Sequence, residues 1–301
     1  MKVSIITINY NSSEFTIKLI RSILTNINSQ SDYEIIIIDN ASYENEYKIL
    51  NSPLLPNDSR IKVYRNKVNN GFSGGNMDGY NKSSGEYLLF INNDCECKND
   101  VLQPLIKFMQ NNDKVGLLTG KVIGLDGKYT GTHKLFPSLS RSLLGNEFVR
   151  WRSKNKFISP KERIIKPTKV EVVSGAFMFF RRSLFEEING FDTEFFLDCE
   201  EEDISKRVWD YGKEVYMLPE PEIFHEHGGS KKENELGLRN EFYISYKKLM
   251  FKHYNKPYSV IMLLLISLKI FKYFFSGRCK YDTVKLALKG FPEEYSLRYK
   301  Q

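Results

Sequence analysis

Two groups of acidic residues are the strongest candidates for chemistry in this sequence. Asp94 follows an apolar run and two asparagines, where a carboxylate can bind Mg²⁺ or Mn²⁺ or can simply close an Asx turn. Residues 200–203 form an unbroken run of acids, EEED, at the start of an expected helix. Repulsion among partly buried carboxylates raises their pKa, which suits a general base, although a solvated helix start explains the run as well.

Two further motifs can bind a metal ion or an anion. His225 precedes Glu226, His227 and a Gly-Gly turn, where an imidazole is a better candidate for a ligand than an isolated histidine. The stretch NNGFSGGN at 69–76 offers backbone N–H groups at a helix start, either to an anion or only for a tight turn. It is neither a P-loop nor a dinucleotide fingerprint, because it has no Gly-Lys-Ser/Thr and no GxGxxG.

A β-α-β-α pattern in the first third of the chain must position these motifs. Apolar runs predict strands over 3–8, 34–38, 60–65 and 87–91. Three of these strands end in polar residues, NYN at 9–11, DN at 39–40 and NND at 92–94. The carboxyl ends of parallel strands share one edge of a sheet, so the pattern predicts a doubly wound α/β fold with a ligand site at that edge.

The remainder of the chain is less regular. Residues 136–167 are basic and predict a long loop with one helix over 139–151. Strands are expected over 170–180, interrupted at 174–176, and over 214–217, and the chain after 234 is expected to be helical. The apolar segment 259–275 contains two lysines, so it fits a core or interface helix and a helix lying in an anionic membrane surface equally well.

Composition limits the class of protein. The chain has 301 residues, of which 41% are hydrophobic and 27% charged, as in a globular protein with one large domain or a domain with an appendage. The N-terminus reads as a strand and not as a signal peptide. Four cysteines without zinc-ribbon spacing indicate reduced thiols and a cytoplasmic protein. A net charge of +7 suits an anionic ligand or membrane, while the scattered basic residues argue against nucleic acid.

Taken together, the motifs resemble the inverting glycosyltransferase family 2, and most closely its rhamnosyltransferase-like branch. The resemblance implies the GT-A fold, a Rossmann-like, mostly parallel sheet flanked by helices, over residues 1–230. A basic helical C-terminal region, 231–301, would face a membrane or another subunit. The resemblance rests on VSIITINYN at 3–11, DNAS at 39–42, NGFSGGN at 70–76, FINND at 90–94, SGA at 174–176, GFD at 190–192, the block 195–203 and residues 225–230.

The resemblance also implies an activity and its residues. A sugar would move from a UDP- or dTDP-linked donor to a hydroxyl of a cell-surface polysaccharide or polyprenyl-linked glycan, at the inner face of the cell membrane. Glu201, beside Glu200, would be the general base, and Asp94 and His225 would bind the Mg²⁺ or Mn²⁺. The nucleotide-sugar would be bound by Thr7, Asn9, Asp39, Asn70, Gly71, Gly74, Asn76, Asn93, Ser174 and Gly175.

Two positions depart from the family pattern. Glu200-Glu201 stands where Glu-Asp is usual, and Asn92-Asn93-Asp94 offers one acid in place of an Asp-x-Asp-like pair. These departures motivate a second hypothesis, a non-catalytic relative that binds a nucleotide or glycan and scaffolds an assembly complex. A sugar-nucleotide-forming nucleotidyltransferase is disfavoured, because the turn after the first strand is NYNSS at 9–13 and not a basic Gly-rich loop.

Overall fold

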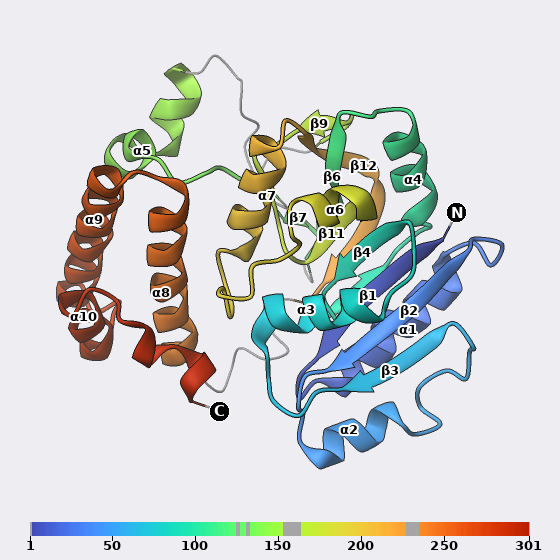
Figure 1. The fold of residues 1–301 in the computed structure, drawn as a ribbon. Helices are drawn as coiled ribbons and strands as arrows, with labels where there is room; N and C mark the ends of the chain where they lie inside the picture. The colour runs from blue at the N-terminus through green and yellow to red at the C-terminus, as the bar shows by residue number, and fades with distance from the viewer. Residues whose placement is uncertain (1, 125–126, 131–132, 153–163, 227–234, 301) are drawn as a thin grey trace.

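A mixed β-sheet lies between two layers of helices in the computed structural model, which describes residues 2–124, 127–130, 133–152, 164–226 and 235–300 (Figure 1). The order of its strands is β3 (Ile61–Arg65), β2 (Tyr33–Asp39), β1 (Val3–Asn9), β4 (Tyr87–Ile91), β11 (Phe177–Arg181), β6 (Val115–Ile123), β12 (Glu214–His225) and β5 (Cys95–Cys97). Beside this path, β7 (Tyr129–Thr130) pairs with β6 and β9 (Thr168–Lys169) with β12. A second small sheet joins β8 (His133–Lys134) to β10 (Val172–Val173).

Helices cover both faces of the main sheet. The helices in chain order are α1 (Ser13–Asn26), α2 (Glu44–Leu50), α3 (Gly71–Lys82), α4 (Leu102–Gln110), α5 (Leu139–Arg152), α6 (Arg182–Glu187), α7 (Glu200–Asp210), α8 (Glu235–His253), α9 (Lys256–Phe275) and α10 (Tyr281–Leu288), with 3₁₀ turns at Glu293–Tyr295 and Leu297–Tyr299. One apolar cluster joins the sheet to α1, α2 and α4, and another joins its opposite face to α3, α6 and α7. This is the doubly wound arrangement that the sequence predicts.

The N-terminal half of the sheet is parallel, as predicted. β1 pairs in parallel with β2 and β4, and β2 pairs in parallel with β3. Ile5 and Ile6 are both fully buried and belong to the two different clusters, which explains why these strands have no polar face. α3 packs directly on β1, since a Cβ at Gly79 would lie only 2.3 Å from Cγ2 of Ile6.

The C-terminal half of the sheet corrects one expectation. The strand predicted over 214–217 is longer, because β12 continues past Pro219 and Pro221 to His225. Its pairing with β6 breaks between Met217 and Glu222, so the missing proline N–H groups cost no ladder hydrogen bond. β12 thereby carries His225 to a position opposite Cys95 of β5.

The C-terminal helices form a separate layer beyond α7 (Figure 1). α8, α9 and α10 pack on one another around Ile244, Ile270 and Phe291. A second contact joins Met250 and Met262 to Phe195 and Cys199, just before α7. The helices expected after 234 are confirmed, and the single helix expected over 139–151 is instead broken by a kink at Gly145, which has φ 79° and ψ 165°. The domain boundary placed between 230 and 231 lies outside the described residues and stays a prediction.

Candidate active site

The predicted nucleotide-binding residues at the ends of β1 and β2 are buried and bonded to each other. Asn9 and Asp39 are register partners, and Asn9 Nδ2 donates a hydrogen bond of 2.9 Å to Asp39 Oδ1. Thr16 Oγ1 donates to Asn9 Oδ1 at 2.8 Å. Thr7 is also fully buried, and its hydroxyl makes no hydrogen bond within the described part of the chain. Asn9, Asp39 and Thr16 thus hold the strand ends together from beneath the surface.

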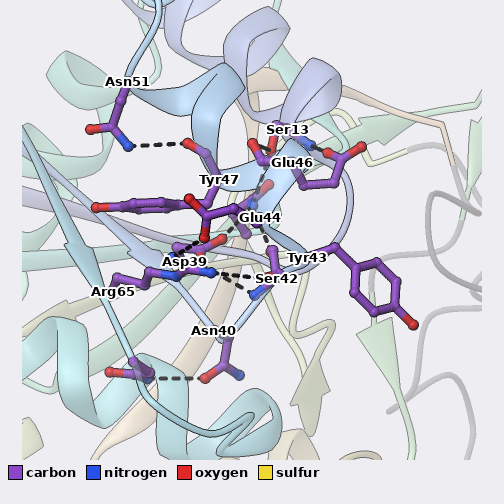
Figure 2. A network of polar contacts seen from close by, with 12 residues as sticks. Ser13, Asp39, Asn40, Ser42, Tyr43, Glu44, Glu46, Tyr47, Asn51 and Arg65 are labelled. Carbon is purple, nitrogen blue, oxygen red and sulfur yellow. Dashed lines mark hydrogen bonds and ion pairs between the residues drawn. The ribbon is translucent and has the colours of Figure 1, made fainter.

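Arg65, which the sequence analysis missed, occupies the accessible side of this network. Figure 2 shows its guanidinium between Asp39 and Glu44, with Nε 3.4 Å from Asp39 Oδ2 and Nη1 2.8 Å from Glu44 Oε2. The guanidinium lies 4.2 Å from the centre of the Tyr47 ring. Tyr43 points away from the network and is exposed. A planar ligand at this edge would meet Arg65 and Tyr43 before it met Asp39.

The Gly-rich stretch forms the start of α3 and fixes the chain around it. Asn70 Nδ2 donates to Asp78 Oδ2 at 2.8 Å, and Asn76 Nδ2 donates to the carbonyl of Phe72 at 3.1 Å. Gly71 has φ +70°, and a Cβ there would lie 2.2 Å from the carbonyl oxygen of Phe196. Gly74 is similarly close to Asn70, because a Cβ at Gly74 would lie 2.7 Å from the Asn70 Cβ. The helix start therefore touches the segment that leads to α7.

Asp94 and His225 lie next to each other where β12 pairs with β5, at the end of the strand order opposite β3. Asp94 Oδ1 lies 3.0 Å from His225 Nε2, and the Asp94 carbonyl accepts a 3.0 Å hydrogen bond from Glu226 N. Cys95 completes a group whose potential ligand atoms lie within 4.8 Å of one another. The sequence analysis paired Asp94 with His225 but missed Cys95, which reads as an ordinary buried strand residue. His227 and residues 228–230 lie outside the described residues.

The donor atoms of this group suit a hard divalent cation. Burial, and then the charge of Asp94, raises the pKa of the Cys95 thiol well above its ordinary value. The carboxylate of Asp94 and the imidazole of His225 are therefore the better ligands of the group for a hard cation. Mn²⁺ and Mg²⁺ accept that combination.

The acidic run begins α7 and turns inward. Asp198 and Cys199 both have positive φ, 66° and 64°, and Glu200 follows with its side chain buried. Burial, and then the charges of Glu201 and Asp198, raises the pKa of Glu200 well above its ordinary value. Burial and Glu201 also raise the pKa of Glu202 to about 7. The sequence analysis expected a raised pKa throughout this run; the two glutamates follow it, whereas the pKa of Asp203 is lowered to about 2 by its cationic partners.

Glu201 accepts hydrogen bonds from two separate segments. Gly175 N donates to Glu201 Oε2 at 3.0 Å, and Lys134 Nζ of β8 contacts Oε1. A Cβ at Gly175 would lie 2.9 Å from Oε2, so a side chain there would displace the carboxylate. Lys134 also lies 3.5 Å from Glu202 Oε1. Sequence reasoning missed Lys134, since nothing in the sequence links its two-residue strand to α7.

The three-residue turn 174–176 joins the two acidic groups. Its Ala176 carbonyl accepts a 3.0 Å hydrogen bond from Asn92 N, two residues before Asp94, while its Gly175 N–H binds Glu201. Ser174 Oγ accepts from Ala176 N at 3.3 Å and so closes the turn. One small element therefore contacts both the strand end that carries Asp94 and the helix that carries Glu201.

Asn93 fixes this strand end from the other side. Its Nδ2 donates to Ser12 Oγ at 2.8 Å and to Thr16 Oγ1 at 2.9 Å. Thr16 also bonds Asn9, so the ends of β1 and β4 are held through α1. The residues predicted for the donor site thus converge on one edge of the sheet, as the polar strand ends indicated.

This fold, with an Asp–His pair and a buried carboxylate cluster at the carboxyl edge of its sheet, is that of a GT-A glycosyltransferase. The family model of glycosyl transferase family 2 matches residues 4–189, and the chain belongs to that family. The expectations of family and fold class are thereby confirmed, while transfer activity and the scaffolding alternative stay predictions.

Curated relatives share this family character over part of their length. Rhamnosyltransferase WbbL of Escherichia coli (strain K12) is 30% identical over 148 residues, which are 48% of this chain and 54% of that protein. The inactive polypeptide N-acetylgalactosaminyltransferase-like protein 5 of Macaca fascicularis is 25% identical over 226 residues, 73% of this chain and 50% of that protein. The chain thus spans about half the length of these relatives.

Solved structures share the fold. GalNAc-T7, crystallised with UDP, GalNAc and Mn²⁺, aligns with a TM-score of 0.62 at 16% identity over 82% of this chain and 48% of its own. S. aureus TarS 1–349 in complex with UDP aligns with a TM-score of 0.56 at 15% identity over 98% of this chain and 82% of its own. The second alignment extends the likeness to the C-terminal helices.

Proposed function

We propose that the protein is a metal-assisted, inverting glycosyltransferase that moves a sugar from a nucleoside-diphosphate-sugar to a glycan hydroxyl, with Glu201 as the general base. The observation that carries the proposal is the turn 174–176, which contacts both the Asp94 strand end and Glu201. An inverting displacement needs the leaving group and the base on opposite faces of the sugar. Two acids from different elements, facing one turn, suit that requirement.

Asp94 and His225 would hold the divalent cation on the donor side. A bound Mn²⁺ or Mg²⁺ supplies positive charge that stabilises the departing diphosphate. The side chains of Asn93 and Asn9 keep the strand ends that border the donor in place through Thr16. GalNAc-T7 and TarS have both been crystallised with UDP, which makes UDP the first nucleotide to test, with dTDP second.

Glu201 would take the proton of the acceptor hydroxyl. Its Oε2 is oriented by the N–H of Gly175, and the approach of an acceptor would replace the contact between Oε1 and Lys134. Burial raises the pKa of Glu200 well above its ordinary value, which favours its neutral form and limits the negative charge next to the base. General base catalysis of this kind contributes about a hundredfold to ten-thousandfold in rate.

The acceptor is proposed to be a cell-surface or lipid-linked glycan, and the enzyme to act in the cytoplasm at the inner face of the membrane. The poly(ribitol-phosphate) beta-glucosyltransferase relative, whose name indicates a polymer as acceptor, supports a polymeric acceptor. All four cysteines are free thiols, which supports a reducing compartment.

A thermal-shift panel of UDP- and dTDP-sugars, each with Mn²⁺ or with EDTA, tests the proposal. A true donor raises the melting temperature with Mn²⁺, because a ligand that binds only the folded state stabilises it by mass action. NMR of the product of the stabilising donor should show an inverted anomeric carbon. A retained configuration would exclude Glu201 as the base of a single displacement, and a panel with no stabilising donor would exclude UDP- and dTDP-sugars as donors.

A further inference from the structure

Helix α9 is packed on one side and bare on the other. Ser259, Met262 and Ile270 are buried against the neighbouring helices, and Ser259 Oγ donates a 2.8 Å hydrogen bond to the carbonyl of Met250 in α8. The opposite side carries large exposed apolar residues which, at about 100° of rotation per residue, fall on one stripe of the helix. These residues are Val260, Ile261, Leu264, Leu268 and Phe275.

Because one side of α9 packs on the neighbouring helices, an orientation along the membrane surface is favoured over one that crosses the membrane. Among the described residues, α9 is one helix whose length and apolar composition would suffice for a membrane span. Crossing would strip it of its contacts with α8 and α10. Crossing would also place Lys269 and Lys272, both exposed, in the hydrocarbon or at its edge, which is costly. In a helix lying flat, lysines beside an apolar stripe reach the headgroups.

Charge around the stripe identifies the partner as anionic. α9 itself contains no acid, and between residues 256 and 289 only Asp282 opposes seven basic side chains, all exposed. These basic residues are Lys256, Lys269, Lys272, Arg278, Lys280, Lys285 and Lys289. A second copy of this chain would bring the same charges face to face, whereas anionic lipid headgroups complement them.

The neighbouring helix α5 enlarges the apolar surface. Leu139 N donates a 3.0 Å hydrogen bond to the Tyr258 hydroxyl, so the start of α5 is anchored beside α9. Leu143, Leu144 and Trp151 of α5 are more than half exposed. In Figure 1, α5, α9 and α10 lie together at the end of the molecule opposite β2 and β3. Contact at this end leaves the rim around Arg65 open to a soluble donor.

We propose that α9 docks on the surface of an anionic membrane, with the stripe from Val260 to Phe275 at the boundary between headgroups and acyl chains and the seven basic side chains against anionic headgroups. Both parts are needed, since apolar burial and electrostatic attraction add in helices of this kind. The inference does not depend on the transfer chemistry, so each can fail alone.

Flotation with vesicles tests the docking surface. The intact protein is expected to float with phosphatidylcholine vesicles that contain phosphatidylglycerol, and to stay behind with phosphatidylcholine alone. The double variant Leu264→Ser/Leu268→Ser should bind about tenfold more weakly, as should Lys269→Gln/Lys272→Gln. The matched controls are Leu54→Ser/Val68→Ser and Lys107→Gln/Lys114→Gln, exposed on other elements, and they should bind like the wild type.

The apolar control is close in exposure. Leu264 and Leu268 are 59% and 64% exposed, and Leu54 and Val68 are 54% and 60%, so a general effect of surface hydrophobicity would weaken both pairs equally. Circular dichroism confirms that each variant is folded.

Equal binding to neutral vesicles, or unchanged binding of the Leu264/Leu268 variant, would overturn the proposal. Light scattering that shows a dimer lost in that variant would assign the stripe to a second copy. Resistance of the bound protein to alkaline carbonate would replace docking with a span.

Discussion

Two clusters of buried polar side chains lie at the same edge of the sheet, and they are built in opposite ways. In the cluster around Asp39, both carboxylate oxygens have partners in Asn9, Ser42 and Arg65. At the start of α7, Oε2 of Glu200 and of Glu202 make no hydrogen bond among the described residues. A network in which every polar group is hydrogen-bonded is rigid and stabilises the fold. Burying a carboxylate oxygen that has no hydrogen-bond donor lowers the free energy of unfolding and favours the protonated acid.

The difference suggests a division of labour. A donor nucleotide needs a pocket that already has its shape, and under the proposed function the Asp39 cluster would supply a fixed frame for one. A general base needs a carboxylate that can change its protonation state. Such carboxylates are typical of sites where buried polar groups lack some of their hydrogen bonds, which lowers the stability of the fold. Within α7 this loss of stability is confined to the first turn, because the next acid, Asp203, is bonded to Arg207, His253 and Lys252.

The largest expected effect comes from removing the charge of Glu201. Glu201→Gln keeps the size of the side chain and an oxygen that can accept from Gly175, but an amide cannot take the acceptor proton. We expect turnover to fall about a thousandfold, with the affinity for UDP changed less than about threefold. Sugar transfer and calorimetry measure the two quantities, with Glu194→Gln, an exposed acid, as the control. Wild-type turnover in the variant would assign the base elsewhere.

The next effect should come from the anchor of α7. Burial raises the pKa of Asp203, but the hydrogen bond from His253 and the charge of Arg207 outweigh it and lower the pKa to about 2. Asp203→Asn leaves Arg207 and Lys252 without their counter-charge, so we expect the free energy of unfolding to fall by about 3 kcal/mol. Urea unfolding measures it, and Asp210→Asn, an exposed acid on the same helix, should cost far less.

The effect of Asp203 should also depend on pH. Because its folded pKa lies below its ordinary value of 3.8, ionised Asp203 stabilises the fold above that pH, and the contribution is lost as pH falls toward 2. The gap in stability between wild type and Asp203→Asn should therefore narrow in acid. A gap that stays constant would mean that the variant loses packing and not charge.

A smaller effect is expected at the donor side. Asp94→Asn should weaken the binding of UDP in the presence of Mn²⁺ by about thirtyfold, equivalent to about 2 kcal/mol. With EDTA, the variant and the wild type should bind UDP alike. Glu96→Gln, on the same strand as Cys95 but outside the ligand group, is the control. Equal loss with and without the metal would assign Asp94 to the frame of the pocket and not to the cation.

Much of this comparison was predictable from the sequence, because it follows local patterns. Isoleucine-rich runs predicted the central strands, and the polar residues after them predicted the edge where Asn9, Asp39 and Asp94 gather. The acidic run 200–203 predicted the raised pKa of Glu200 and Glu202, but not the lowered pKa of Asp203, which depends on cations from α8 and on Arg207. Each of these signals is contained in a few consecutive residues.

Contacts between residues that are far apart in the sequence could not be predicted. Arg65 and Lys134 look like ordinary basic residues, and only the sheet order brings the first to Asp39 and the second to Glu201. The prolines in β12 suggested a strand end, because the break in pairing that accommodates them is a tertiary feature. In α9, apolar residues occupy nearly every side, so periodicity could not tell the packed face from the bare one.

The smallest expected effect separates the loss of stability caused by burying the acidic cluster from the role of the cluster in catalysis. The pKa of Glu202, raised to about 7 from 4.5 by burial and by Glu201, means that its ionised form destabilises the fold as pH rises from 4.5 through 7. Glu202→Gln should therefore raise the melting temperature at pH 8 by about 2 °C, and should leave it unchanged at pH 4. Lys134 keeps its contact with Glu201 in this variant, and Glu187→Gln, on an exposed acid, should change neither value. A gain in stability with unchanged turnover would place the function in Glu201 alone, whereas a gain with lost turnover would mean that the unsatisfied acid is itself part of how the base works.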